Sequence, residues 1–514
     1  MSERLHRLAA IVRADFFVRF RRPSTVVVFL LLSACAYLWV PAPSTGRALI
    51  VIAGSRAIYN SAAIGMATAM LGTIFVGLFG FYVVSNAIRR DVQSRCGYVI
   101  ASTTMRGSEY VAGKFLGNVV FLTVFMSGFM LTSMIMVIVR GEAPLQPLVF
   151  AWQYLLLVPP SIVFVSALAI TFESMPLLRG KFGDVLYFFL WAVCLGLVGS
   201  LAEKGNVPPA ARWFDFSGFA FAFETITRIA GTTSMSIGAS GFDRGKPPIL
   251  FNGLQLANEW ILPRIGATLM PMLLLFVARA FFHRFDPARI RAVAQKSQWK
   301  FLGWLNALAK PIARLLTAIF PASNAVAADA RTAIADLPLI APAMIGFAIA
   351  SLASNDVMPI AFAAVAIAIA DIASREKRAG TLAFVYAAPR LRERFVLWKF
   401  LSAVLVATIF LALPLIRFIL TRPSMAIAIV VGIIFVCAAA TALGVISANP
   451  KTFIVAFLTF WYLVVNSKGA TPALDFAGFY GIATPMVIAS YAAAALAFLV
   501  LAHAYHVSEL RRRW

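Results

Sequence analysis

Residues 374–399 read SREKRAGTLAFVYAAPRLRERFVLWK, and residues 89–114 read RRDVQSRCGYVIASTTMRGSEYVAGK. Each stretch is a charged, amphipathic insert between two long apolar runs. The two inserts agree at a constant separation of 285 positions, since Arg90-Asp91 corresponds to Arg375-Glu376 and Lys114-Phe115-Leu116 to Lys399-Phe400-Leu401. This agreement predicts that one membrane unit occurs twice in the chain, with one insert in each copy.

The composition indicates the class of protein. Of the 514 residues, 61% are hydrophobic and only 13% are charged, whereas soluble domains usually have about 45–50% apolar and about 25% charged residues. We expect an all-α polytopic membrane protein with about twelve transmembrane helices, because lipid offers no partner for an unpaired backbone group. The twelve apolar runs are residues 24–41, 61–88, 115–139, 148–172, 184–203, 260–282, 337–354, 357–373, 400–420, 424–447, 451–467 and 483–505.

The runs divide into two units of six spans, which are expected to be parallel repeats because six is an even number. Residues 1–283 form the first unit, with an N-terminal amphipathic helix over 1–22 and an outer segment over 204–259. Residues 284–336 are predicted to be a cytosolic linker with an interfacial amphipathic helix, and residues 337–514 form the second unit. A second pair of matching motifs, DFSGF at 215–219 and DFAGF at 475–479, supports the repeat.

The formal net charge of +24 raises the possibility of nucleic-acid binding. A twelve-span topology with the N-terminus inside places most of the Lys and Arg on the cytoplasmic side, which is the positive-inside pattern. The basicity is therefore interpreted as topology and contact with anionic lipid, and nucleic acid is not expected as a partner. We expect the chain in the bacterial cytoplasmic (inner) membrane, with both termini cytoplasmic.

The motifs of catalysis and metal binding are not found in the sequence. The four cysteines lack metal-ligand spacing: Cys35, Cys194 and Cys437 fall in apolar runs, and Cys96 lies in the first insert. No GxxxxGK[ST] loop is present, and no Ser-His-Asp or HExxH arrangement occurs. We therefore expect neither an enzyme nor a cofactor in this chain.

The inserts resemble those of type-2 ABC transporter permeases, the membrane subunits of ABC exporters. The family pattern is a charged Arg-Asp or Arg-Glu pair, a glycine, a small-Pro-basic turn and a lysine at re-entry. The second insert matches this pattern well, and the first has Thr104 where the proline should be. The resemblance implies coupling to ATPase through the two inserts. The coupling residues it indicates are Arg90, Asp91, Gly97, Lys114, Arg375, Glu376, Gly380, Phe384, Tyr386, Pro389 and Lys399.

The same resemblance implies partners outside the chain. A separate ATPase subunit, in two copies, would dock on residues 89–114 and 374–399 and would hold the ATP and magnesium. The family also has re-entrant helices near the outer end of each unit, where Asp215, Gly218, Asp475 and Gly478 are located. These four residues are expected to form an outer gate or re-entrant turn, although a helix cap explains them equally well.

Two other classes of protein are compatible with the sequence. A secondary transporter would work without an ATPase, but it normally has ionisable groups or broken helices near the bilayer midplane. A non-transporting membrane anchor of a complex would need neither a pathway nor two docking elements. The substrate of a transporter is not indicated by any motif.

Overall fold

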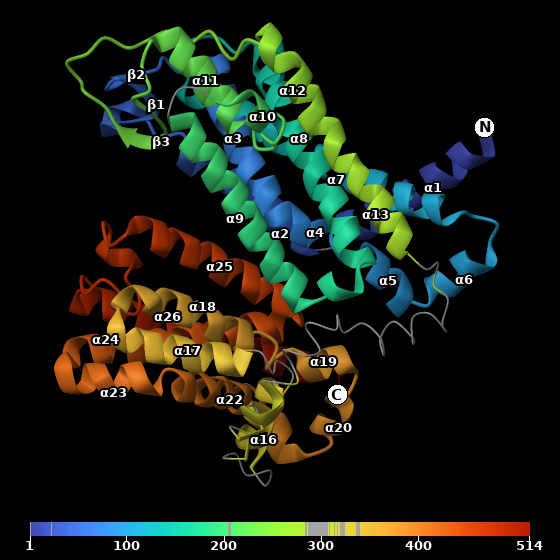
Figure 1. The fold of residues 1–514 in the computed structure, drawn as a ribbon, viewed down its shortest axis with the longest axis vertical. Helices are drawn as coiled ribbons and strands as arrows, with labels where there is room; N and C mark the ends of the chain where they lie inside the picture. Colours follow the sequence, from blue (N-terminus) through green and yellow to red (C-terminus); the bar gives the residue numbers. More distant parts are fainter. Residues whose placement is uncertain are drawn as a thin grey trace. The chain divides into compact units, whose positions relative to one another are not determined.

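The computed structural model describes residues 2–21, 23–203, 207–282, 285, 307, 309–312, 314, 315, 317, 318, 324–335 and 340–513. The chain forms two compact units, Met1–Ser297 and Gln298–Trp514, and most described residues are helical (Figure 1). The helix predicted in the linker over 284–336 lies for the most part outside the described residues.

Unit 1, Met1–Ser297, begins with a helix that precedes the first apolar helix. The remaining long helices are joined by short turns and by a small outer region. The helices of unit 1 are α1 (Ser2–Phe20), α2 (Pro23–Trp39), α3 (Ser61–Phe75), the π-helical turn η2 (Val76–Gly80), α4 (Phe81–Val84), α5 (Ala87–Gln93), α6 (Cys96–Ser102), α7 (Gly107–Arg140), α8 (Pro147–Ser174), α9 (Lys181–Glu203), α10 (Pro209–Arg212), α11 (Phe219–Ala230), α12 (Asn258–Leu269) and α13 (Leu274–Phe281), with short 3-10 turns at Pro43–Thr45, Pro176–Leu178 and Met270–Leu273.

Unit 2, Gln298–Trp514, has the same general order of a helix before the first apolar helix and an insert after the second. From residue 324 onward its described helices are α16 (Ala325–Ala335), α17 (Ile340–Ala353), α18 (Met358–Ile369), α19 (Arg375–Ala379), α20 (Leu382–Tyr386), α21 (Pro389–Glu393), α22 (Phe395–Phe410), α23 (Ala412–Thr421), α24 (Pro423–Ser447), α25 (Pro450–Ser467) and α26 (Pro485–Arg513), with 3-10 turns at Asn355–Val357 and Pro472–Leu474.

Several helices are long and apolar enough to cross a membrane, so the chain has the character of a multi-pass membrane protein. Among the described residues there are seven: Ser61–Gln93, Gly107–Arg140, Pro147–Ser174, Lys181–Leu201, Asn258–Phe281, Pro423–Ser447 and Pro485–Arg512. Two bent pairs, Glu3–Phe20 with Thr25–Trp39 and Phe395–Phe410 with Ala412–Thr421, raise the number to nine if each pair is one span.

Twelve spans are therefore more than these helices provide. The predicted runs 337–354, 357–373 and 451–467 fall on α17, α18 and α25, which do not meet the same criteria of length and hydropathy. Because α18 has only 12 residues, it is about 18 Å long at 1.5 Å per residue and cannot cross the hydrocarbon alone. The twelve-span arrangement and the repeat stay predictions.

A small antiparallel sheet in unit 1 departs from the predicted all-α fold. Strands β1 (Arg47–Ile52), β2 (Ser55–Arg56) and β3 (Met235–Gly241) are arranged in the order β2-β1-β3. The link between β1 and β2 is Ala53-Gly54, with φ values of 50° and 85°, as a type I′ hairpin turn requires. The prediction missed this sheet because the main partner of β1 lies far away along the chain, in the outer segment over 204–259.

Candidate functional site

A cluster of buried ion pairs connects the first insert to the N-terminal part of α7. The Lys114 side chain is buried, and its Nζ lies 2.7 Å from Oδ2 of Asp91 on α5 and 2.9 Å from Oδ1 of Asp15 on α1. Tyr110, one turn before Lys114, donates its hydroxyl to Asp91 at 2.6 Å. Three elements, namely α1, the start of the insert and α7, therefore meet at one ammonium group.

Helix α1 can reach this cluster because small residues of α7 face it. A Cβ on Gly113 would lie 2.8 Å from Cδ1 of Ile11, and a Cβ on Gly117 would lie 3.4 Å from Cβ of Asp15. The spacing Gly-x-x-x-Gly places both glycines on the same helix face, and such pairs let two helix backbones approach closely. Lys114 stands between the two glycines and meets Asp15 across this contact.

Unit 2 contains a similar cluster, with a glutamate in place of one aspartate. Lys399 on α22 is fully buried, and its Nζ lies 2.9 Å from Oδ2 of Asp329 on α16. The same ammonium group pairs with Glu376 on α19, at the start of the second insert. Arg375 adds a further contact to Asp329 at 3.4 Å. Helix α16 precedes the first apolar helix of its unit, as α1 does in unit 1.

A second cation offsets the second carboxylate in each cluster, since Arg19 lies 3.8 Å from Asp15 and Arg375 lies 3.4 Å from Asp329. A buried ion pair costs desolvation energy that only close, well-paired geometry offsets, so removing one partner is costly. Burial raises the pKa of Asp329, and the nearby Lys399 opposes this rise. The sequence predicted Asp91, Glu376 and the two lysines as site residues, and the structure brings Asp91 to Lys114 and Glu376 to Lys399.

The first insert is built on a break after α4. Ser85 leaves the helix in an extended conformation, Asn86 takes a left-handed conformation with φ 71°, and α5 begins at Ala87. The Glu173 carboxylate, at the end of α8, caps α5 by accepting the backbone N–H groups of Ala87 at 2.9 Å and Ile88 at 2.6 Å. A carboxylate is favourable there because a helix N-terminus carries partial positive charge.

The two glycines that the sequence paired have different roles. Gly97 is buried in α6 under Phe285, since a Cβ there would lie 2.7 Å from the Phe285 ring. Gly380 ends α19 in a left-handed conformation with φ 74°, and an added Cβ would meet nothing within 4 Å. Pro389 opens α21 at its first turn, where a proline costs no hydrogen bond. Arg90 is partly buried on α5, next to Asp91.

The C-terminal helix α26 contacts the second insert through hydrogen bonds and an ion pair. Tyr386 is only 7% exposed, and its hydroxyl lies 3.3 Å from Nδ1 of the buried His506. The other ring nitrogen of His506 lies 2.9 Å from the carbonyl oxygen of Arg392, and Lys377 pairs with Glu509 at 2.9 Å. Tyr386 is therefore buried between the second insert and α26, and it is not available as an exposed contact residue.

The most exposed apolar side chain of each insert lies among arginines in the sequence. Phe384 on α20 is 81% exposed, and Val99 on α6, at the equivalent position 285 residues earlier, is 67% exposed. The exposed arginines around them in sequence are Arg378, Arg390 and Arg394 in the second insert and Arg89, Arg95 and Arg106 in the first. An exposed aromatic residue with a basic rim is a suitable surface for an acidic protein partner.

The two acidic turns predicted as an outer gate are buried turns. The Asp215 carboxylate accepts the Phe221 backbone N–H at 2.9 Å, and Arg264 donates to the Asp215 carbonyl oxygen at 2.7 Å. The Asp475 carboxylate accepts the backbone N–H groups of Tyr480 and Ile482 at 3.3 and 3.1 Å. The Asp215 carboxylate therefore caps the start of α11, whereas the Asp475 carboxylate closes the turns that precede α26, and the gating role stays a prediction.

Glycine in these turns is required for two separate reasons, which substitutions can distinguish. Gly218 and Gly478 have φ values of 78° and 70°, and a Cβ would lie 2.6 Å from Leu157 at Gly218 and 2.8 Å from Ala428 at Gly478. Gly481 has nearly the same φ, 71°, but open space around it. An alanine would strain the backbone at both Gly478 and Gly481, because both have a left-handed conformation. Only at Gly478 would its Cβ also collide with a neighbouring residue.

We expect Gly478→Ala to lower the thermal midpoint of the purified protein clearly more than Gly481→Ala does. Both substitutions carry the cost of a left-handed alanine, roughly 1–2 kcal/mol, and only Gly478→Ala must also displace α24. Thermal unfolding of the detergent-purified protein, followed by size-exclusion chromatography with fluorescence detection, measures the difference. Equal midpoints for the two variants would show that close contact between Gly478 and α24 does not limit the size of the side chain at position 478.

Sequence reasoning missed three residues of the site: Asp15, Asp329 and His506. The two aspartates are separated by 314 positions, and the inserts by 285, so no single alignment offset reveals both relations. The signal that could have found them is the Ala-Asp pair at 14–15 and 328–329, in each case on the helix before the first apolar helix of its unit. His506 lies 120 positions after Tyr386, and no motif in the sequence connects the two.

The geometry defines a multi-pass membrane protein with two ion-anchored inserts. Among the described residues, no group of three or more His, Cys, Asp or Glu is arranged to hold a metal ion. The sequence matches no protein-family model, and a search of curated proteins finds no relative.

Proposed function

We propose that this chain is the transmembrane permease subunit of an ATP-driven ABC exporter, in which residues 89–114 and 374–399 dock separate ATPase subunits. In this proposal the chain has twelve spans in two parallel six-span units and lies in the bacterial cytoplasmic membrane with both termini inside. ATP and magnesium are bound by the partner, which is present in two copies. The export direction is what the resemblance to type-2 ABC permeases implies.

The observation that carries the proposal is the similar construction of the two inserts. In each unit a buried lysine at the foot of a long helix joins the start of the insert to the helix that precedes the first apolar helix. At equivalent positions each insert exposes an apolar side chain, Val99 or Phe384. Two exposed inserts, each fixed to its unit by buried ion pairs, could bind two copies of one partner. A loop that binds no partner would not require buried ion pairs to hold its position.

The chemistry of the inserts specifies the partner's surface. The partner should have an apolar pocket that receives the exposed Phe384 side chain. It should also have carboxylates around that pocket that pair with the flanking arginines. Buried anchors of this kind supply most of an interface's binding energy, while rim charges mainly orient the partner. The first insert has valine in place of phenylalanine and should therefore bind less tightly.

A secondary transporter is a weaker alternative on this structure. The Lys114 and Lys399 clusters involve α5 and α19, the helices that open the inserts, so these ionisable groups belong to the ends of the long helices. A secondary transporter would instead be expected to place such groups near the midplane of its spans.

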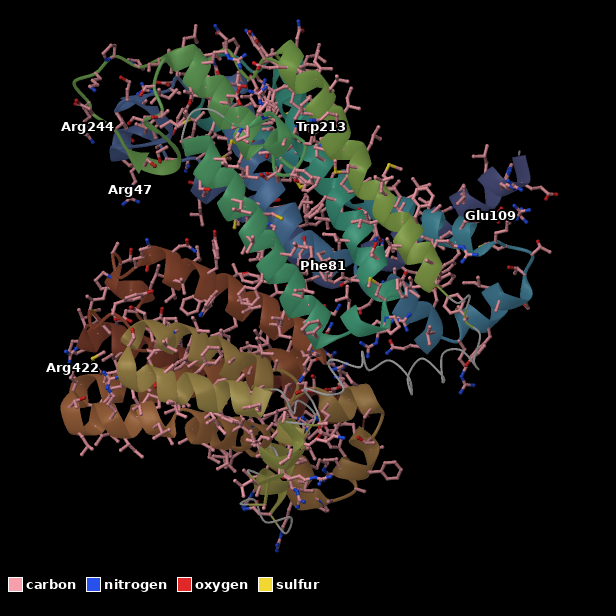
Figure 2. All side chains as sticks on the ribbon, viewed as in Figure 1. Arg47, Phe81, Glu109, Trp213, Arg244 and Arg422 are labelled. Carbon is pink, nitrogen blue, oxygen red and sulfur yellow. The ribbon has the colours of Figure 1, made fainter. Side chains whose placement is uncertain are left out.

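The orientation of unit 1 tests a requirement of the proposal. Glu109, in the first insert, and Trp213, beside the Asp215 turn, lie toward opposite ends of the long helices (Figure 2). Tyr98 in the insert and Phe214 near the turn are equally exposed, at 54% and 55%, so they form a matched pair for labelling. An ATPase can reach the insert only from the cytoplasm.

We expect Tyr98→Cys, in a chain carrying Cys96→Ser, to react with a membrane-impermeant maleimide only after the cells are permeabilised. Phe214→Cys in the same background should react in intact cells. The measured quantity is the labelled fraction of each variant before and after permeabilisation. Labelling of position 98 from outside would eliminate ATPase docking at the first insert.

A further inference from the structure

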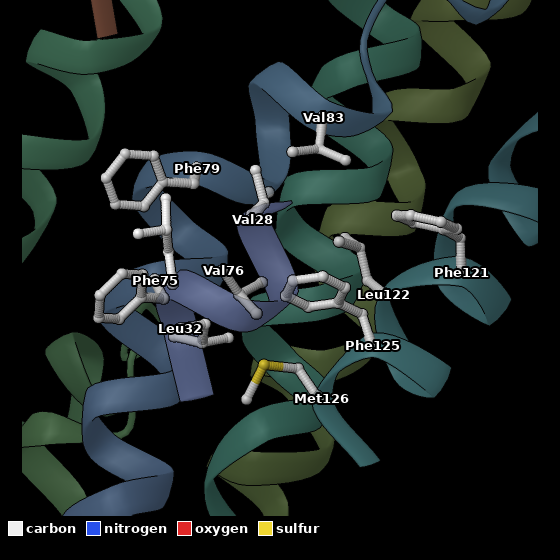
Figure 3. A pocket seen from close by; sticks show the side chains of 12 residues that line it. Val28, Leu32, Phe75, Val76, Phe79, Val83, Phe121, Leu122, Phe125 and Met126 are labelled. Carbon is white, nitrogen blue, oxygen red and sulfur yellow. The ribbon is translucent and has the colours of Figure 1, made fainter. Parts of the chain in front are cut away.

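An apolar cavity lies in unit 1 between α2, the α3–η2–α4 helix and α7. Its volume is about 130 Å³, close to the ~150 Å³ of an engineered apolar cavity that binds benzene. Figure 3 shows its lining, which comes from all three helical segments and contains no polar side chain. The π-helical turn Val76–Gly80 forms one wall, and π turns are frequent at functional sites.

The cavity has a buried floor and a side open to the surroundings of the protein. The floor consists of Leu32, Val76, Leu122 and Met126, all of which are buried. Leu31 also lines the cavity but is 62% exposed. Because α7 and the α3–α5 helix are both long enough to span a membrane, the medium at this opening is lipid hydrocarbon.

A row of aromatic rings connects the cavity to α1. Phe125 and Phe121 both line the cavity, with ring centroids 6.3 Å apart. Phe121 lies 6.3 Å from Phe16 on α1, and Phe16 lies 5.7 Å from Phe17. The row leads from the cavity to the exposed face of α1, and the buried Arg19 guanidinium lies beside it, 5.7 Å from the centroid of the Phe121 ring.

Two arginines are held at the far end of this row. The guanidinium groups of Arg13 and Arg21 lie 5.9 and 5.7 Å from the centroid of the Phe17 ring, one on each side in sequence. Both arginines are exposed, as are Phe17 and Val18. This face of α1 therefore combines apolar side chains that enter a bilayer with cations that stay at its surface.

We propose that the cavity and α1 form a binding site for an anionic phospholipid, with the phosphate at Arg13 and Arg21 and one acyl chain along Phe17, Phe16 and Phe121 into the cavity. The apolar lining fits an acyl chain, since it offers no hydrogen bond to a polar ligand. The two arginines give the site its preference for negative charge. The proposal depends on the membrane location and is independent of any ATPase.

Occupancy of this site would link the lipid to the ion cluster at the first insert. Asp15, which pairs with Lys114, lies on α1 between Arg13 and Phe17. A phospholipid that fixes the angle between α1 and α2 would thus also fix the position of Asp15. The effect of the lipid on the insert is a consequence of the site and is separate from the test of binding.

The test uses the full-length protein in vesicles with spin-labelled phosphatidylglycerol or phosphatidylcholine, and it measures the motionally restricted fraction of each lipid. We expect the wild-type protein to prefer phosphatidylglycerol, with about fivefold of preference from each arginine. Arg13→Gln with Arg21→Gln should reduce this preference to the level that the other basic residues of the chain maintain, and should leave chain restriction intact. Val28→Phe, which fills the cavity from α2, should lower the restricted fraction by the equivalent of one lipid per chain, because lipids around the other spanning helices stay restricted.

Two further variants protect this result from misinterpretation. Val27→Phe adds the same group at an exposed position next to Val28 and should bind lipid as the wild type does. Val83→Phe fills the cavity from the opposite wall and should reproduce the loss seen with Val28→Phe even if one of the two folds poorly. Equal restriction of the two lipids by the wild type, or full binding by both filled variants, would overturn the proposal. Displacement by an uncharged amphiphile without any preference for charge would instead assign the cavity to a cargo, and would equally overturn it.

Discussion

Replacing Lys399 with methionine should destabilise unit 2 severely. Lys399 is fully buried and is the cation shared by Asp329 and Glu376, so its loss leaves two carboxylates in a site with little water. Breaking a buried ion pair by removing one partner typically costs about 3–5 kcal/mol. Because marginal stability is of the order of 5–15 kcal/mol, we expect a large drop in thermal midpoint and in the yield of monodisperse protein.

Restoring neutrality should recover much of this loss. In the triple variant Lys399→Met, Asp329→Asn, Glu376→Gln, neither carboxylate is left charged without its lysine, and the remaining cation, Arg375, keeps its pair with Asp371 at 3.5 Å. Removing all members of a buried ion pair costs much less stability than removing one of them. The measurement is the thermal midpoint in detergent for the wild type, the single variant and the triple variant. The difference in thermal midpoint between the triple variant and Lys399→Met measures how much the unpaired carboxylates destabilise the protein.

Lys377→Met is the matched control for this experiment. Lys377 also makes an ion pair, with Glu509 at 2.9 Å, but its side chain is 29% exposed and water can solvate the carboxylate that is left. Exposed pairs usually contribute about 0–1 kcal/mol, so the control should stay near the wild type. If Lys399→Met were as mild as Lys377→Met, the buried cluster would not be what anchors the second insert.

The helices of the fold were largely predictable because apolar runs of spanning length have few alternatives in lipid. The predicted run 115–139 lies within α7 (Gly107–Arg140), and 424–447 coincides with α24 (Pro423–Ser447) to one residue. The three-stranded sheet was not predictable in the same way. Residues Leu49–Ile52 form a short apolar run whose role depends on pairing with β3, nearly 190 residues later.

The site was predictable only in part, and for a related reason. Charges at the ends of apolar runs identify Lys114 and Asp91, but spacing along the chain does not reveal that Asp15 completes their cluster. Aromatic identity likewise does not distinguish Phe384 from Tyr386, which the fold places on opposite sides of α20. Phe384 is exposed, whereas Tyr386 is buried against His506. Both distinctions depend on tertiary packing that no local pattern contains.

Truncating the exposed apolar residues of both inserts should release an ATPase partner. Val99 and Phe384 occupy equivalent positions, and each is surrounded in sequence by exposed arginines. An aromatic anchor often contributes about 2 kcal/mol or more to an interface, which is roughly 30-fold in affinity. Val99→Ala should have a smaller effect, because valine buries less area than phenylalanine. Both residues are exposed, so we expect membrane expression to be unchanged.

Retention of ATPase activity by the tagged, full-length chain tests docking at the inserts most directly. The chain is purified from its native membranes, and ATP hydrolysis and photolabelling by an azido-ATP analogue are measured per mole of chain. The control variant Leu148→Ala with Phe214→Ala removes two exposed apolar side chains that lie outside the inserts. We expect hydrolysis and a labelled partner with the wild type and the control, and at least a tenfold reduction of both with Val99→Ala and Phe384→Ala together. A wild-type chain without any ATP-hydrolysing partner, or full retention of that partner by the double variant, would contradict the proposed function.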